Sequence, residues 1–351
     1  MFLNITIKKL IYSLLLISTL LTLFIFIIRF FNSISLFELR HVLTSGYEEE
    51  SLLEIWYNLN KGELYLNHLS FPYRWTVYNW LFYDFYSLVF IIQKYLFNLS
   101  FEWLPTYLRL TTLSGSILLF FTVFKTAKLL NGFSKIKFYL IFILIFGLSF
   151  GYWNITVRPD IFSLLFETIA IFYFIKKRNN IDIKDLILIA LILYIAWSFK
   201  QTALIVFCAI NLYFLVNSKL KLNIIMCSIF GLLLVATIYV HNDNYLKTMY
   251  FIGTAYPSDL DIFIKNSIKL LSKNIILFMA LSIILFEFIF LRKISFNIKN
   301  LDKENFFLFS GLVLSIFYYL IVSTNAGVSD NHTFQILIFI MLIIIKNEQI
   351  I

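Results

Sequence analysis

A run of carboxylates near the start of this sequence could take part in acid–base catalysis. Three of them, Glu48, Glu49 and Glu50, stand in a row in the stretch SGYEEESLLEIWYNLNKGELY. If a helix begins near Glu48, Glu49 shares a face with three apolar residues, Leu52, Leu53 and Trp56. Glu50 and Glu54 then share a different stripe, which we expect to face solvent. The pattern therefore predicts that Glu48 and Glu49 face inward, as a general base would. The alternative is an acidic helix start stabilised by the helix dipole.

A second group of candidate site residues lies in two short charged motifs that interrupt apolar sequence. In TVRPD, Arg158 and Asp160 flank Pro159, a residue that suits the first turn of a helix. In WSFKQTAL, Lys200 and Gln201 interrupt what would otherwise be one long apolar stretch. A lysine at such a turn can hold an anionic phosphate through charge-assisted hydrogen bonds. The alternatives are a salt-bridged helix start for the first motif and a plain outer turn for the second.

A third polar group lies near the end of the sequence, in STNAGVSDNHTF. Asn331 and His332 follow Asp330 there and directly precede an apolar run. Polar turn chemistry explains this composition as well as a substrate-binding role does, so both interpretations stay open. The segment 241–273 carries further histidine and aspartate residues, and it is long enough to act as a lid over a site.

Composition indicates an integral membrane protein. Of 351 residues, 60% are hydrophobic and 14% are charged, whereas soluble domains are nearer half apolar and a quarter charged. Apolar runs about as long as a bilayer core recur along the chain, and inside lipid such runs form helices because nothing else satisfies the backbone. The net charge of +9 falls in small clusters between these runs, so nucleic acid is not an expected partner. Cys208 and Cys227 lie inside apolar runs, which offers neither a disulfide framework nor a zinc site.

The basic clusters set the expected topology, because cytoplasmic loops carry an excess of Lys and Arg. All clusters fall on one side if the aromatic segment 77–97 is an interfacial or re-entrant helix that does not cross. Both termini are then cytoplasmic, and residues 1–351 form one all-α polytopic domain whose first extracytoplasmic loop covers 32–106. About ten transmembrane helices are expected by length, at 10–31, 107–130, 138–156, 160–175, 185–199, 202–217, 223–240, 274–291, 305–323 and 333–346.

The order of these features resembles the C-type (GT-C) superfamily of polytopic glycosyltransferases, and is similar to its group of protein mannosyltransferases and the lipid A aminoarabinose transferase. The resemblance runs from the first span to about residue 335. It rests on an acidic pair followed by a helix, a Gly and a Tyr in the first outer loop, on an Arg-x-Asp at the outer start of a span, and on a Lys-Gln between two spans. These positions are Glu48, Glu49, Gly62 and Tyr65, then Arg158 and Asp160, then Lys200 and Gln201.

The resemblance implies an inverting transfer of a sugar from a polyprenyl-phosphate-linked donor to a glycan, lipid or protein acceptor. The reaction would take place at the extracytoplasmic face of a membrane, which for a bacterial chain is the inner membrane, in cell-envelope polysaccharide biosynthesis. Glu48 or Glu49 would be the general base, and Asp160 would orient the acceptor or bind a metal. The leaving phosphate would be neutralised by Arg158, Lys200 and Arg74. Substrate contacts would come from Gln201, Asn331 and His332.

A divalent cation and two other functions stay open at this stage. Clustered carboxylates beside a phosphate suit Mg²⁺ or Mn²⁺, although nothing in the sequence requires a metal or assigns its ligands. An O-antigen or capsule-type polymerase would also act on polyprenyl-linked glycans, with arginine-rich outer loops. A lipid-glycan transporter would place ionisable residues in mid-span, where Glu167 and Glu287 are the main acids.

Overall fold

The computed structural model contains only helices and turns across the residues it describes. These residues form fourteen α-helices and several short 3₁₀ helices, without a β-strand. The prediction of an all-α protein is therefore confirmed for this part of the chain. The described residues are 2–35, 47–62, 64–66, 76–241, 243–254, 258–287, 302–324 and 330–348.

Each of the ten expected spans overlaps one helix of the structure. These helices are α1 (Phe2–Ser35), α4 (Leu104–Asn131), α5 (Lys135–Phe146), α6 (Asp160–Lys177), α7 (Ile183–Phe199), α8 (Ile205–Val216), α9 (Leu220–Val240), α12 (Ile275–Phe286), α13 (Lys303–Val322) and α14 (Phe334–Lys346). The remaining α-helices are α2 (Tyr47–Lys61), α3 (Trp80–Phe97), α10 (Asp243–Thr254) and α11 (Leu260–Lys273).

Helix length separates clear membrane spans from shorter elements. Within the described ranges, four segments are long and apolar enough to cross a bilayer, namely Tyr12–Ile34, Phe101–Asn131, Leu220–Val240 and Lys303–Val322. A fifth is added if α11 and α12, which are bent by 84° at their junction, count as one span. A helix of 12 residues, such as α5 or α8, is only about 18 Å long, well short of a bilayer core. The chain is thus an integral membrane protein with several spans, and the number ten stays a prediction.

The span expected at 138–156 is wrong in its second half. Helix α5 ends at Phe146, and the chain passes through a turn into the 3₁₀ helix η2 (Gly151–Asn154). The Asn154 side chain donates a 2.5 Å hydrogen bond to the carbonyl of Ile145, in the last turn of the helix. The C-cap residue Gly147 leaves the helical conformation for an extended one. A side-chain donor on the last turn and a glycine directly after it both favour a helix end.

Helix α3 forms within the segment expected to be interfacial. Its N-cap Asn79 accepts from the backbone N–H of Trp80, and its C-cap Asn98 is left-handed. It is not among the segments that meet the length and composition criteria for a span. Its last turn is exposed and, apart from Lys94, apolar, with Tyr95 89% exposed. These properties agree with a helix at the membrane surface, which stays a prediction.

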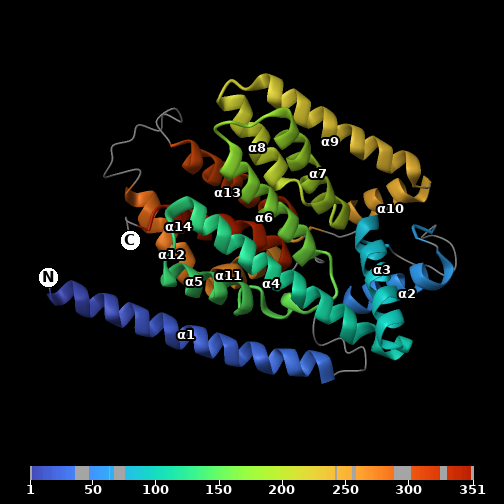
Figure 1. Ribbon diagram of the computed structural model, residues 1–351, viewed down its shortest axis with the longest axis horizontal. Helices are drawn as coiled ribbons and strands as arrows, with labels where there is room; N and C mark the ends of the chain where they lie inside the picture. Colours follow the sequence, from blue (N-terminus) through green and yellow to red (C-terminus); the bar gives the residue numbers. More distant parts are fainter. Residues whose placement is uncertain are drawn as a thin grey trace.

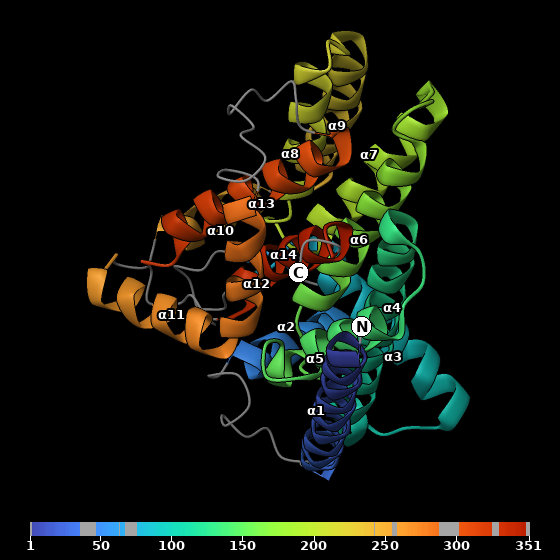
Figure 2. The ribbon, with the colours of Figure 1, turned by 90° about the vertical axis from the view of Figure 1, so that its left-hand side faces the viewer.

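Helix α14 is the centre of the packed core. Every side chain from Phe334 to Ile345 is buried, and the helix lies in the middle of the fold in two perpendicular views (Figures 1 and 2). Gly311 of α13 permits this packing, because a Cβ there would lie 2.2 Å from the Phe339 ring. By contrast, α1 and α9 lie on opposite edges of the molecule with largely exposed apolar side chains (Figure 1). Such surfaces suit contact with lipid.

Candidate functional site

Asp160 is the centre of a buried cluster of charged and polar side chains. Its Oδ1 accepts hydrogen bonds from Lys200 Nζ at 2.5 Å and from Asn331 Nδ2 at 2.8 Å. Its Oδ2 lies 3.3 Å from Arg158 Nε. All four side chains are buried. The structure therefore brings together four of the residues that the sequence offered as a site.

Three helix ends position this cluster. Asp160 is the first residue of α6, and Lys200 is the C-cap of α7, where the backbone turns from helical to extended. Asn331 lies in the short 3₁₀ helix η5 (Asp330–Thr333), directly before α14. Helices α6 and α7 are connected by a short turn and pack against each other. The end of α7 is thereby placed beside the start of α6.

Two aromatic rings hold Arg158 in place. The guanidinium carbon of Arg158 lies 4.2 Å from the centroid of the Trp153 ring and 5.5 Å from that of the Tyr78 ring. Guanidinium–aromatic contacts of this kind are favourable and leave the N–H edges of the group directed past the ring. Neither Trp153 nor Tyr78 was identified in the sequence, because a cation–π contact between distant segments leaves no spacing pattern.

Glu48 is bound to Arg109 in a buried ion pair. Arg109 Nε donates to Glu48 Oε1 at 2.9 Å and Nη2 donates to Oε2 at 2.7 Å. The backbone N–H of Val157 also donates to Glu48 Oε1 at 2.9 Å, and Arg109 Nη1 donates to the Ser33 carbonyl at 2.7 Å. Glu48 faces inward as predicted, and it connects α2 and α4 to the residue before Arg158. Arg109, inside a long apolar helix, was missed.

The helical phase predicted for α2 is wrong in part: Leu52 is buried as expected, but three other residues lie on the opposite side from the one predicted. Glu54, expected on the surface, is 3% exposed and accepts a 3.0 Å hydrogen bond from Thr76 Oγ1. Leu53 and Trp56, expected on the inner face, are 50% and 37% exposed. The bonds of Glu48 to Arg109 and Val157 fix the rotation of the helix, and apolar side chains can face outward in a protein whose surroundings include lipid.

Glu50 lies in electrostatic range of Arg158. The Glu50 side chain reaches the surface, as predicted, but partial burial of its carboxylate raises its pKa and Arg158 opposes that shift. It belongs to the same helical stripe as the buried Glu54, one turn away. Glu49 is half-buried on a neighbouring face. The charge of Glu50 thus interacts with the Arg158 end of the cluster.

Gln201 and His332 extend the polar cluster. Gln201 Nε2 donates a 3.0 Å hydrogen bond to the carbonyl of Val77, next to Tyr78. His332 Nδ1 shares a 2.9 Å hydrogen bond with the Tyr318 hydroxyl. Burial lowers the pKa of His332 well below its usual value, and the positive charge of Lys200 adds to this effect. His332 is therefore neutral at pH 7. Arg74 lies outside the described residues.

The carboxylates of the site do not fit a divalent cation. Asp160 faces two basic groups, and Glu48 has both oxygens bound to Arg109. Over the described part of the chain, no group of three or more His, Cys, Asp and Glu side chains is suited to hold a metal ion. A metal ion at Asp160 would have to displace two cations that are already in contact with it.

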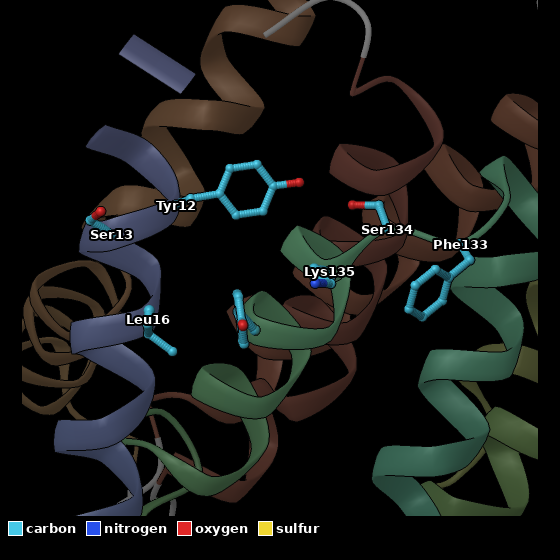
Figure 3. Close-up of a pocket in the computed structure, with 7 residues that line it drawn as sticks. Tyr12, Ser13, Leu16, Phe133, Ser134 and Lys135 are labelled. Atoms are coloured by element: carbon cyan, nitrogen blue, oxygen red, sulfur yellow. The ribbon is translucent and has the colours of Figure 1, made fainter. Parts of the chain in front are cut away.

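A separate cavity lies at the other end of α1. It has a volume of about 600 Å³ and is lined by Tyr12, Leu16, Ser134, Lys135 and others, between α1 and the start of α5 (Figure 3). Tyr12 precedes Ser33, the residue of α1 that contacts Arg109, by 21 positions, or about 30 Å along a helix. The cavity is therefore not part of the Asp160 cluster.

Comparisons with known proteins do not assign this chain to a family. No protein-family model matches this chain, and no curated protein matches it. What the fold and composition establish is the class, an all-α integral membrane protein.

Proposed function

We propose that this chain is a membrane glycosyltransferase that moves a sugar from a polyprenyl-phosphate-linked donor to an acceptor hydroxyl. The observation that carries the proposal is the buried cluster in which Arg158 and Lys200 both contact Asp160. A phosphate beside the cluster would accept charge-assisted hydrogen bonds from these two cations.

The cluster suits a leaving phosphate better than a resting one. As the bond between the sugar and the phosphate breaks, negative charge grows on the departing oxygen. Preorganised cations in a buried site stabilise such charge most strongly in the transition state. Asp160 and Trp153 hold Lys200 and Arg158 in place before the donor arrives, so little reorganisation accompanies the reaction. In this proposal Asp160 is a positioning residue, since its Oδ1 is already bound to Lys200 and Asn331.

The general base assigned here is Glu50. The two oxygens of Glu48 are held by Arg109 and by the Val157 backbone, so Glu48 acts as the anchor of α2. The carboxylate of Glu50 reaches the surface and interacts with Arg158, and its raised pKa makes it a better proton acceptor. This assignment replaces the sequence-based choice of Glu48 or Glu49.

The proposed step is a single displacement. The acceptor oxygen attacks C1 of the donor sugar from the face opposite the phosphate, and Glu50 takes the proton of that hydroxyl. The new bond between C1 and the acceptor oxygen forms as the bond between C1 and the phosphate oxygen breaks. Polyprenyl phosphate leaves with the bonding pair toward Arg158 and Lys200, and the configuration at C1 is inverted. The charge topology predicted from the sequence places this step on the extracytoplasmic side of the membrane, in bacteria the inner membrane.

Transfer in membranes tests the proposal. Membranes containing the full chain are given a panel of radiolabelled polyprenyl-phosphate sugars and membrane glycans as acceptors. We expect one donor to give a labelled product, and Lys200→Met to remove that product while Lys200→Arg retains part of it. Unchanged donors across the panel would contradict the proposal.

A lipid-glycan transporter is the second candidate, favoured by one observation. Glu167, midway along α6, is buried, and its Oε2 accepts a 3.1 Å hydrogen bond from Gln335 of α14. Its Oε1 has no hydrogen-bond partner within the described ranges. Transporters place ionisable groups at such depths. Glu167→Gln would abolish flux of a labelled lipid-linked sugar across vesicles if the chain is a transporter, and would leave sugar transfer largely intact if it is a transferase.

A further inference from the structure

A second cavity, outside the cluster of Asp160, has walls of a distinct chemistry. It has a volume of about 340 Å³ and lies where the first turn of α3, the last turn of α9 and helix α7 meet. Three of its lining residues are aromatic, namely Trp80, Tyr194 and His241. A carboxylate, Asp84, stands one turn beyond Trp80 on α3 and also lines the cavity.

The aromatic side chains of this cavity are held rigidly. His241 stacks on Tyr245, with ring centroids 4.8 Å apart, and its ring lies 5.8 Å from that of Trp80. Tyr245 in turn donates a 2.6 Å hydrogen bond to Asn79, the N-cap of α3. The Tyr194 hydroxyl is hydrogen-bonded to Thr237 of α9. Rigid aromatic rings bind a ligand at low cost in conformational entropy.

Polar groups that line the cavity can form hydrogen bonds with the hydroxyl groups of a ligand. Asp84 Oδ1 accepts a 2.9 Å hydrogen bond from Asn58, which orients the carboxylate, and carboxylate oxygens accept more than one such bond. The pKa of His241 is lowered by burial, so its ring is neutral and can both donate and accept.

We propose that this cavity binds a sugar ring of a glycan acceptor. The apolar C–H face of a sugar ring packs on an aromatic side chain, and its hydroxyl groups require donors and acceptors in the plane around it. Trp80 supplies the face, and Asp84 and His241 supply the polar partners. The cavity lies within the size range of small-molecule sites.

The position of the cavity identifies the sugar as one of the acceptor. The short segment Tyr78–Asn79 separates it from the proposed phosphate site: the Tyr78 ring covers Arg158, while the Asn79 side chain contacts Tyr245 behind the cavity. In the proposed function, the donor sugar is attached to a phosphate held by Arg158 and Lys200, and would lie on the Arg158 side of this segment. A ring in the cavity therefore belongs to a second saccharide, which makes a glycan the expected acceptor. This inference rests on the proposed function.

Binding without turnover tests the inference separately from the transferase reaction. Full-length protein in lipid nanodiscs is titrated with phosphate-free methyl hexosides and short oligosaccharides, and saturation-transfer NMR reports ring C–H protons that contact the protein. We expect at least one oligosaccharide to bind. Trp80→Ala should raise the dissociation constant of this saccharide about tenfold or more, because it removes the aromatic ring on which the sugar packs. Trp103→Ala, which removes another partly exposed indole at the start of α4, is the matched control.

Asp84→Asn and Tyr194→Phe keep the shape of the cavity and protect the test against misfolding of Trp80→Ala. Both should reduce saccharide affinity while the protein keeps its thermal unfolding midpoint. The inference is overturned if no saccharide binds, if Trp80→Ala and Asp84→Asn bind as the unmodified chain does, or if tetramethylammonium alone binds in the cavity as an aromatic cage would bind it. Loss of transfer in Lys200→Met with normal saccharide binding supports both proposals, and unaltered transfer in that variant contradicts only the proposed function.

Discussion

Arg109 and Glu48 form a buried bidentate ion pair, with N–O distances of 2.9 and 2.7 Å, between helices α4 and α2. The same carboxylate accepts the backbone N–H of Val157, next to Arg158. One side chain thus joins helix α2, a membrane-spanning helix and the turn that carries the cationic cluster. The charge of Glu48 is used to hold the site together.

Loss of either partner of this ion pair should destabilise the protein strongly. Arg109→Met leaves a buried carboxylate without its cation, which typically costs about 3–5 kcal/mol. We expect a large drop in the thermal unfolding midpoint of the detergent-solubilised chain, and a similar drop for Glu48→Gln. The control is Lys177→Met: Lys177 is 41% exposed, and its partner Asp185 keeps hydrogen bonds from Tyr173 and from the backbone N–H of Asp182, so the midpoint should stay nearly unchanged. Equal midpoints for Arg109→Met and Lys177→Met would contradict a structural role of the pair.

Glu50 and Glu49 provide a matched comparison for the base. Glu50→Gln keeps size and hydrogen bonding but removes proton acceptance, so the rate of transfer should fall by about 10²–10⁴-fold. Glu49→Gln removes the same charge from the adjacent residue and should retain most activity. Initial rates of sugar transfer at saturating donor measure the difference. If Glu49→Gln is the inactive variant, the base is Glu49 and the assignment to Glu50 fails.

Acidification should destabilise the protein through His332. Its pKa in the folded chain is depressed, so the folded state favours the neutral ring, while the unfolded state takes up a proton near pH 6.5. The contribution to stability is complete above that pH. It decreases as pH falls from about 6.5 toward the folded-state pKa, by at most about 1.4 kcal/mol per pH unit.

Unfolding midpoints between pH 8 and pH 5 test this dependence. His332→Gln keeps a hydrogen-bonding partner for Tyr318 but does not titrate, so the unmodified chain should lose more stability over that range than the variant. Parallel profiles would show that His332 does not titrate on unfolding. The comparison also removes the contributions of other histidines, which are common to both proteins.

The topology has a direct test by cysteine labelling. In a background without Cys208 and Cys227, Asn60→Cys lies on α2 and Phe133→Cys lies between α4 and α5; both side chains are exposed. We expect a membrane-impermeant maleimide to label position 60 from outside intact cells and to label position 133 only after permeabilisation. Labelling of both from outside would mean that α3 crosses the membrane.

Helices could be predicted from the sequence, but the contacts between their ends could not. Long apolar runs determine helices in lipid because the backbone has no other partner, and each expected span overlaps a helix. Charge topology also placed Arg158, Asp160, Lys200 and Asn331 on one face. Their contact, which joins positions up to 171 residues apart, required the tertiary structure.

The errors have the same physical origin. The rotation of α2 is set by the pairing of Glu48 with Arg109, a residue 61 positions away, so local periodicity gave the wrong face for Glu54. The early end of α5 depends on a hydrogen bond from Asn154 back to Ile145. In both places a polar contact made across a turn or between helices decides the local structure.

The transfer assay with Lys200→Met tests the central claim most directly. Lys200 lies 2.5 Å from Asp160 and is the cation that the account assigns, with Arg158, to the leaving phosphate. Membranes of the unmodified chain should convert one labelled polyprenyl-phosphate sugar into a glycan product, and Lys200→Met should lose about 10²-fold or more of that rate. A chain that consumes no donor of the panel, or a Lys200→Met variant as active as the unmodified chain, would contradict the account.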